Sequence, residues 1–430
     1  MRRKLALSFA TLTALAAVGA LAASATPAAK AAAKPDMVTV WNQTMVNALE
    51  TAKTPPPPAM RTGAIVQSSV FDALNGIERR YTPIHVQPAA PPGASREAAV
   101  AEAAYEALVT LFPAQKPTFD AQLAASLAQI GGGPNDQSVQ RGLDWGKQVA
   151  DDILNWRAGD GINAVLPSYS ASGLPGRWAP TPPTFGLPLF RAFANMTPWA
   201  MTTPSQFLPG PPPTLTSALY TQDFNETKAM GSATSSTRSA YQTQTAQFYG
   251  TDTPAAIWNR LADDLAESDH LTMTENARLL ARMNVALADA VIAIWNAKNV
   301  YDTWRPITAI QQAAADGNPN TMPDASWTPL LPTPQFQEYP AGHPGVSNAG
   351  LSVLAAFYGN DTSFTVTSAG VPGVTRDYTN FSTAAEDVAD ARVFGGMHFR
   401  FSCDTAIQMG SEIANLVDNT VALRVHGPDR

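Results

Sequence analysis

The residues of this chain that could do chemistry are basic, and they lie in three short stretches of its second half. Lysine, arginine and histidine side chains are hydrogen-bond donors or potential cations. If they converge in the fold, an anion is the simplest species to balance them. Arginine donates to paired oxygens of a tetrahedral oxyanion, and backbone amides at a helix start also bind anions. These residues predict a site for a phosphate-like oxyanion: Lys298, Arg305, His343, Arg392 and His398.

The first pair, Lys298 and Arg305, closes a long apolar stretch. Seven residues make about two helical turns, so the spacing predicts that both side chains point the same way from one helix. A second interpretation stays open, because two cations at a helix C-terminus can simply offset the helix dipole.

The two histidines of interest are embedded in glycine and proline. His343 precedes Pro344, which suits the first turn of a helix, and follows Gly342, whose backbone amide is available to an anion. His398 comes six residues after Arg392, and six residues do not share one face of a straight helix. Gly395 and Gly396 must therefore end the helix if Arg392 and His398 are to meet. Each histidine taken alone fits a structural role equally well.

Other catalytic patterns are missing from the sequence. There is no Gly-x-Ser-x-Gly elbow, no His-Glu-x-x-His, no phosphate-binding Walker loop and no cluster of carboxylates at metal-ligand spacing. Cys403 is the one cysteine, so no internal disulfide can form.

The elements that must position these residues are predicted to be helices, with little strand. The fold class expected is all-α, a helical bundle or bundles with long proline-rich loops. Apolar spacing and caps predict helices at 35–54, 60–80, 95–112, 117–130, 137–157, 215–250, 254–304 (with a break near 272–274), 344–358 and 402–423. A capping box at Thr383 predicts the start of one more helix, and residues 364–367 and 374–378 predict a hairpin.

Residues 158–214 differ from the rest because prolines recur throughout and exclude helices. Aromatic residues are interleaved with the prolines, which is atypical of a disordered linker. This proline-rich loop is predicted to be ordered and packed on the helical body. Two roles stay open: it could line a cleft, or it could only cover the body. Its aromatic residues are Trp178, Phe185, Phe190, Phe193, Trp199 and Phe207.

Composition narrows the class of protein. Only 15% of the 430 residues are charged, so most helices should be substantially buried. The net charge is −7 and no basic stripe is visible, which argues against nucleic acid as a partner. Residues 1–25 have the basic start, apolar stretch and small residues of a signal peptide, and predict a secreted or periplasmic protein without a membrane span after cleavage. A transmembrane anchor is the alternative.

The predicted organisation has four parts. The signal peptide (1–25) is followed by a linker and an N-terminal helix (26–59), then by a helical region that contains the proline-rich loop (60–250), and finally by a helical region that carries the basic residues (251–430).

Three ordered motifs now resemble a known signature. Lys298-x6-Arg305-Pro306, Pro340-Ala341-Gly342-His343 and Arg392-x5-His398 are similar to the three-part signature of the vanadium-dependent haloperoxidases. Type 2 phosphatidic acid phosphatases and bacterial acid phosphatases share it. The resemblance covers about a quarter of the chain, from Lys298 to His398.

The resemblance implies roles for individual residues. His398 would hold vanadate, the expected cofactor, whose site phosphate could also occupy. Lys298, Arg305, Arg392 and the Gly342 amide would hold its oxygens, and His343 would be the general acid/base. Hydrogen peroxide bound at the vanadate and polarised by Lys298 would oxidise halide, and a small organic substrate would accept it. Trp295 and Phe336 match positions that border the halide site in chloride-oxidising members.

Two alternatives to a haloperoxidase stay open. In an acid phosphatase or phosphatidic acid phosphatase with the same pocket, His398 would attack phosphorus and His343 would protonate the leaving group. A non-catalytic anion-binding helical protein is the other. Three departures bear on the choice. Ala341 and Ala391 stand where the family usually has serine, and Ser402 stands where it often has aspartate, so whether Asp404 orients His398 is an open question.

Overall fold

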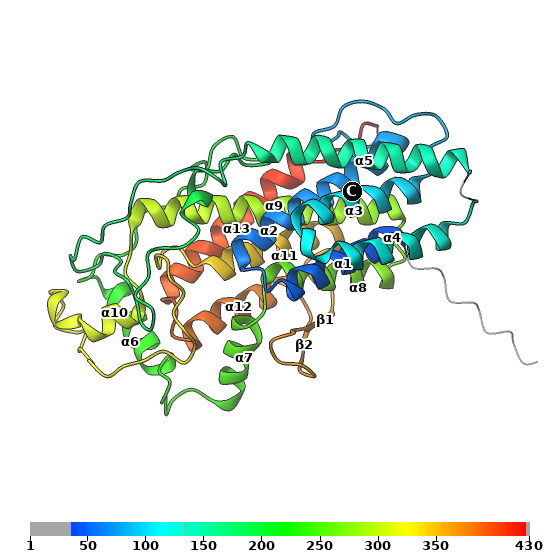
Figure 1. Ribbon diagram of the computed structural model, residues 1–430. Helices are drawn as coiled ribbons and strands as arrows, with labels where there is room; N and C mark the ends of the chain where they lie inside the picture. The colour runs from blue at the N-terminus through cyan, green and yellow to red at the C-terminus, as the bar shows by residue number, and fades with distance from the viewer. Residues whose placement is uncertain (1–35, 134, 427–430) are drawn as a thin grey trace, which may run out of the picture. The chain divides into compact units, whose positions relative to one another are not determined.

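The protein is built almost entirely of α-helices, as the computed structural model shows for residues 36–133 and 135–426 (Figure 1). Residues 1–35, which contain the predicted signal peptide, lie outside the described residues. The helices are α1 (Met37–Thr51), α2 (Pro56–Glu78), α3 (Arg96–Leu111), α4 (Lys116–Ile130), α5 (Gln137–Ala158), α6 (Ala218–Met230), α7 (Ala240–Gly250), α8 (Pro254–Ser268), α9 (Met273–Tyr301), α10 (Pro306–Gln311), α11 (Gly342–Tyr358), α12 (Phe381–Phe394) and α13 (Arg400–Thr420), with short 3-10 turns η1 (Pro113–Gln115), η2 (Arg191–Asn195) and η3 (Ala313–Ala315).

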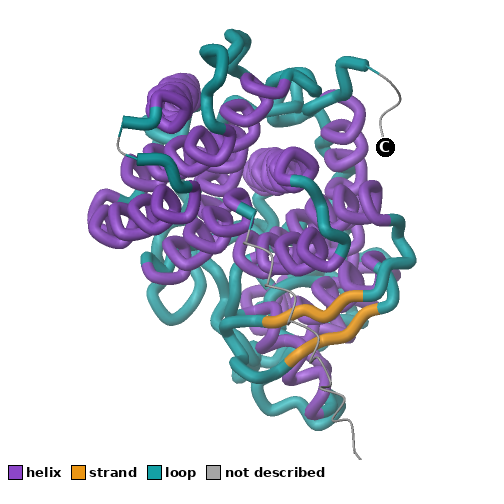
Figure 2. Tube along the Cα trace, turned by 90° about the vertical axis from the view of Figure 1, so that its right-hand side faces the viewer, coloured by secondary structure: helices purple, strands orange, loops and turns teal. Residues whose placement is uncertain are grey.

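The predicted all-α class is confirmed, and so is the hairpin. Strands β1 (Phe364–Thr367) and β2 (Thr375–Tyr378) pair antiparallel, with Phe364 opposite Tyr378, and form the two-stranded sheet drawn in orange in Figure 2. In the described part of the chain, no helix is long and apolar enough to cross a bilayer. The chain from Asp36 onward is one compact unit, and its predicted division at residues 59/60 and 250/251 stays a prediction.

Helix α9 lies at the centre of the fold. It starts at a capping box in which Thr272 and Glu275 satisfy each other's backbone amides, which is also why the long helical stretch breaks before it. Residues 276–295 are all buried, so the prediction of a helix apolar around most of its circumference is confirmed. Helices α2, α11 and α13 pack on it, and its last turn carries Lys298.

Three helix starts differ from the sequence prediction. Helix α2 begins at Pro56 rather than near residue 60, because a helix tolerates proline in its first turn, where no intrahelical bond is lost. Helix α12 begins at Phe381, and Asn380, not Thr383, is its N-cap: the Asn380 side chain accepts the Thr383 N–H at 2.8 Å. Helix α13 begins at Arg400, two residues before the predicted start.

The proline-rich loop is ordered and anchored to the helices, as predicted. The Asp289 carboxylate of α9 accepts the backbone N–H groups of Trp199, Ala200 and Met201 at 2.8–2.9 Å. Arg157, at the end of α5, stacks its guanidinium 3.5 Å from the centroid of the Trp199 ring. The side chains of Asp289 and Arg157 are both buried, so the loop is anchored in the protein interior at these two points.

Candidate active site

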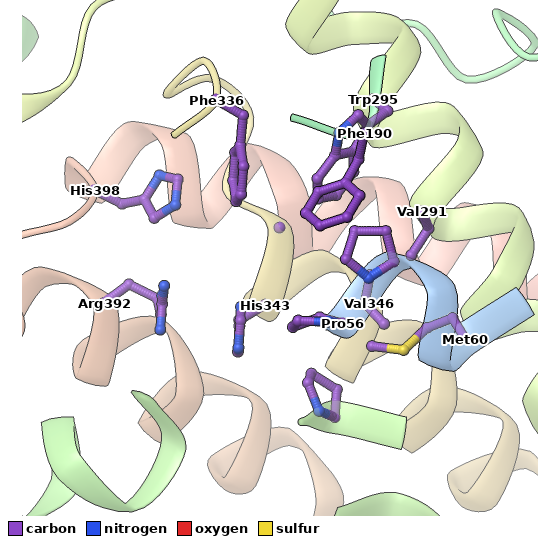
Figure 3. A pocket seen from close by; sticks show the side chains of 13 residues that line it. Pro56, Met60, Phe190, Val291, Trp295, Phe336, His343, Val346, Arg392 and His398 are labelled. Atoms are coloured by element: carbon purple, nitrogen blue, oxygen red, sulfur yellow. The ribbon is translucent and has the colours of Figure 1, made fainter. Parts of the chain in front are cut away.

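The basic residues singled out in the sequence come together from five separate elements. Lys298 lies in the last turn of α9, His343 in the first turn of α11 and Arg392 in the last turn of α12. Arg305 is the N-cap of α10, and His398 lies in the link between α12 and α13. Figure 3 shows His398, Arg392 and His343 facing one another at one end of a pocket. The predicted convergence is therefore correct.

The route by which Lys298 and Arg305 converge is not the predicted one. Helix α9 ends at Tyr301, and Asp302 takes up a left-handed conformation (φ 47°) that turns the chain. Arg305 therefore belongs to the next helix start rather than to the helix of Lys298. The prediction of one shared helix face was wrong, because an aspartate can end a helix without glycine or proline.

Lys298 holds the turn that leads into α11. Its ammonium donates to the carbonyls of Gln337, Glu338 and Pro340 at 2.8, 2.9 and 2.6 Å, and its side chain is buried. Burial, and then the neighbouring charge of Arg305, lower the pKa of Lys298 well below its usual value. In this structure all three ammonium protons are therefore directed at backbone oxygens.

Arg305 is held by backbone carbonyls and faces His398. Its Nε donates to Phe336 O at 2.6 Å, and its Nη1 donates to Met397 O at 2.9 Å and to His398 Nε2 at 3.0 Å. Its Nη2 is buried and has no hydrogen-bond partner among the described residues. Burial lowers the pKa of Arg305 to about 9, so it stays cationic at neutral pH.

His398 is oriented by a residue to which the sequence interpretation gave no role. The Nδ1 atom lies 2.8 Å from Oε1 of Glu338, and both side chains are buried. A guanidinium can only donate, so Nε2 accepts from Arg305 and Nδ1 carries the proton given to Glu338. Burial lowers the pKa of His398 well below its usual value, which agrees with a neutral ring.

The acid that orients His398 is therefore Glu338 and not Asp404. Asp404 is exposed, whereas Glu338 is fully buried and also accepts the Phe399 N–H at 3.1 Å. Burial raises the pKa of Glu338 to about 7, against the opposing charges of Lys298 and Arg305. In the sequence, Glu338 is distinguished only as an acidic residue in the proline-containing stretch before His343. Sixty residues separate it from His398, so its partner could not be inferred.

Arg392 is buried with few partners. Its Nη2 lies 3.2 Å from Sδ of Met397, while Nε and Nη1 have no hydrogen-bond partner among the described residues. Burial lowers the pKa of Arg392 to about 10, so this guanidinium also remains charged at neutral pH. Unpaired donors on a buried cation cost free energy unless a bound ligand accepts hydrogen bonds from them.

His343 stands at the N-terminus of α11, as predicted, and its ring makes no hydrogen bond to any described residue. Burial and the charges of Arg392, Arg305 and Lys298 lower its pKa well below the usual value, so the ring is neutral. A Cβ at Gly342 would lie 3.7 Å from the Trp295 ring, which is an ordinary van der Waals distance.

Ala341 is the N-cap of α11 without a side-chain hydrogen bond. It is fully buried in a small apolar cluster with Val393 and Cys403. The departure from serine therefore removes a possible donor and puts a methyl group among apolar neighbours.

An aromatic chamber of about 40 Å³ adjoins the two histidines. Trp295 and Phe336, both predicted for this region, lie 5.0 Å apart between ring centroids, and Phe190 packs on Trp295 at 6.4 Å. Phe190 comes from the proline-rich loop, so that loop does contribute a wall of the site. At the other end of the chamber lie Met60 and Val291 (Figure 3).

The donor set fits a tetrahedral oxyanion. Three buried N–H-bearing atoms, Nη2 of Arg305 and Nε and Nη1 of Arg392, lack acceptors in the described chain. Lys298, Arg305 and Arg392 exceed Glu338 in charge, and a neutral imidazole presents Nε2 toward this cationic side. A bare metal ion has no comparable place, since the described residues contain no group of three or more His, Cys, Asp or Glu suited to one.

This combination defines an all-helical protein with a buried, polycationic oxyanion site. A family model described as the VCPO second helical-bundle domain matches residues 278–427. Vanadium chloroperoxidase of Curvularia inaequalis is 28% identical over 185 residues, which is 35% of this chain and 30% of that protein. The match thus spans about a third of the relative's length.

Solved structures extend the likeness to nearly the whole chain. The first bacterial vanadium-dependent iodoperoxidase is 25% identical, with a TM-score of 0.80 over 92% of this chain and 98% of that one. A holo-type bacterial vanadium-dependent chloroperoxidase shares the fold at 18% identity, with a TM-score of 0.68 over 84% of this chain and 91% of that one. The family model, the curated relative and the solved structures all confirm the resemblance of the three motifs to the vanadium haloperoxidases.

Proposed function

We propose that this protein is a vanadium-dependent haloperoxidase that uses hydrogen peroxide to oxidise halide. The observation that carries the proposal is the set of unpartnered donors on Arg305 and Arg392 beside a neutral His398 whose tautomer is fixed by Glu338. A structural ion pair would have used those donors within the protein. An oxyanion cofactor gives each of them an acceptor.

The residues that would hold vanadate follow from their chemistry. His398 would bind through Nε2, because Nδ1 keeps its proton for Glu338. Arg305 and Arg392 would donate to the oxygens, and the amide of Gly342 at the start of α11 would add the helix dipole. Lys298 would supply positive charge and keep the 337–340 turn in place through its three carbonyl contacts. Bound vanadate supplies a Lewis-acidic centre that activates peroxide toward halide without changing its own redox state.

His343 would move protons at this site. Its ring is neutral and makes no hydrogen bond to the described residues, so a ring nitrogen can take a proton from incoming peroxide and return it to the leaving oxygen. Trp295 and Phe336 would receive the halide at their ring edges, which carry the positive part of the aromatic quadrupole. Lys298, with Nζ 5.4 Å from the Phe336 centroid, adds attraction for an anion there.

The proposal also covers where the enzyme acts and what accepts the oxidised halogen. The predicted signal peptide supports export, so the enzyme would act as a secreted or periplasmic protein on external halide. A small organic molecule would then accept the oxidised halogen.

A pair of assays tests the function. Wild type, His398→Ala and the exposed-histidine control His270→Ala would be loaded with orthovanadate and assayed for peroxide-dependent halide oxidation and for phosphate ester hydrolysis. We expect halide oxidation in wild type and in the His270 variant, and its loss in His398→Ala. Hydrolysis without halide oxidation would establish the phosphatase alternative. Neither activity at full vanadate occupancy, measured by calorimetry, would leave an anion-binding protein.

A further inference from the structure

Met397 is the residue that connects the two arginines of the site. Its carbonyl accepts from Nη1 of Arg305 at 2.9 Å, and its sulfur lies 3.2 Å from Nη2 of Arg392. Among the described residues, this sulfur is the one hydrogen-bond partner of the Arg392 guanidinium, because Nε and Nη1 have none. The carbonyl contact survives any substitution, whereas the sulfur contact depends on methionine.

The surroundings of Met397 hold that sulfur in place. The side chain is 2% exposed. A Cβ added at Gly395 would come within 2.9 Å of its Cε, so the thioether end is already packed against the backbone. Gly396, at φ 74°, turns the chain directly before Met397, and a Cβ there would lie 2.5 Å from the Gly231 carbonyl. The residue therefore has little freedom to leave Arg392.

We propose that Met397 is a positioning residue for Arg392 and, for the same reason, an oxidative modification site that links peroxide turnover to loss of oxyanion affinity. The second half of this proposal rests on the proposed function. The sulfur contacts Nη2 of a guanidinium that lines the chamber together with His343 and His398. Met60 also lines the chamber, whereas Met397 contacts it only through Arg392.

The chemical step is the ordinary oxidation of a thioether. The oxidant is the hypohalous acid formed in turnover: a sulfur lone pair attacks its halogen and displaces hydroxide, hydroxide then replaces the halogen on sulfur as halide leaves, and loss of a proton gives the sulfoxide. The sulfur loses two electrons and the halogen gains them. The product, methionine sulfoxide, is a much stronger acceptor than a thioether, so it would compete with the anion for Arg392. The added oxygen also has little room beside Gly395.

The first arm of the test measures binding without peroxide. Wild type, Met397→Leu and the control Met409→Leu, another buried methionine, would be titrated with inorganic phosphate and with orthovanadate by calorimetry. Leucine keeps the volume and removes the acceptor, so we expect Met397→Leu to bind both anions roughly threefold to tenfold more weakly. Unfolding temperatures would show that each variant is folded. Equal or tighter binding by Met397→Leu would overturn the positioning role.

The second arm measures modification. Wild type with vanadate, peroxide and bromide would be digested, and the sulfoxide content of Met397 would be compared with that of Met322, which is 65% exposed. We expect peroxide alone to favour Met322, and turnover to favour Met397 in step with the loss of phosphate affinity. Met397→Leu should keep its affinity through the same treatment. Equal loss of affinity in Met397→Leu, or an unmodified Met397 after inactivation, would overturn the proposal.

The two arms separate this inference from the proposed function. If no halide is oxidised but Met397→Leu still weakens phosphate binding, the haloperoxidase assignment fails and the positioning role stands. If halide is oxidised and the peptides carry oxidised Cys403 instead of Met397, the modification site is wrong and the function stands.

Discussion

At the scale of single residues, the hydrogen bond between His398 and Glu338 decides what the site can bind. A buried imidazole can present its lone pair on either nitrogen, and Glu338 fixes the proton on Nδ1. Nε2 is then turned toward Arg305 and the donors around it. The carboxylate also makes the imidazole more basic, which strengthens it as a ligand.

Removal of the Glu338 charge should lower the affinity for orthovanadate without abolishing binding. Glutamine can still accept from His398 and from the Phe399 N–H, so the geometry survives while the charge is lost. We expect Glu338→Gln to bind orthovanadate about tenfold to a hundredfold more weakly, the usual range for partners of a metal-ligating histidine. Calorimetric titration of the two proteins measures this.

Asp404→Asn is the matched control for that measurement. Asp404 is exposed and lies six residues after His398. Its substitution should leave vanadate affinity within twofold of wild type. A large loss in Asp404→Asn, or none in Glu338→Gln, would show that Glu338 does not orient His398.

The residues of the site were predictable in part. His343 and His398 could be selected because they lie close to glycine or proline, and Lys298 and Arg305 because they close a long apolar stretch in a chain with little charge. Glu338 could not be assigned from spacing, because its partner lies sixty residues away and nothing local distinguishes it. The contacts of Lys298 with three backbone carbonyls were equally invisible, since a backbone acceptor carries no residue type.

At the scale of elements, the proline-rich loop behaves as part of the core. Asp289 satisfies three consecutive backbone N–H groups of this loop from within α9, and it does so while buried. Because Phe190 belongs to the same loop and forms a wall of the aromatic chamber, the anchor at Asp289 is also coupled to the site.

Loss of this anchor should free the loop. Asp289→Ala leaves three N–H groups without their acceptor, and we expect it to lower the free energy of unfolding by about 3 kcal/mol or more. Limited proteolysis should then cut within residues 158–214. Asn296→Ala, which removes a single hydrogen bond from α9 to the carbonyl of Ala194, should cost about 1 kcal/mol and leave the loop resistant. Equal protease resistance of both variants would contradict the anchor.

The elements themselves were mostly predictable, because apolar periodicity and caps are local signals. The buried α9, the break before it and the hairpin all follow from such signals. The turn at Asp302 and the N-cap at Asn380 did not, because each depends on a single polar residue that is also common in loops.

At the scale of the whole molecule, buried acids make stability depend on pH. Asp263 of α8 is 3% exposed, and neither of its oxygens has a hydrogen-bond partner among the described residues. Burial raises its pKa to about 8. A raised pKa means that the folded protein holds a proton that the unfolded chain has released, so this contribution to stability is present at low pH and is lost as the pH rises toward 8.

Asp263→Asn should remove that dependence. The amide imitates the protonated acid, so we expect the variant to match wild type near pH 4 and to exceed it increasingly up to pH 8, by at most about 1.4 kcal/mol per pH unit. Urea unfolding at several pH values measures the difference. The exposed control Asp361→Asn should run parallel to wild type, and a parallel Asp263→Asn curve would show that Asp263 stays ionised.

The carbonyls that hold Lys298 and Arg305 have a consequence for how such chains diverge. Five of the acceptors on these two cations are backbone oxygens, of Phe336, Gln337, Glu338, Pro340 and Met397, and a backbone oxygen is the same whatever side chain it bears. The side chains of these five residues can therefore change without loss of the hydrogen bonds to Lys298 and Arg305, provided that the backbone keeps its conformation. Such conservation of backbone position at low identity is seen with the bacterial iodoperoxidase structure, which is 25% identical to this chain and superimposes on it with a TM-score of 0.80.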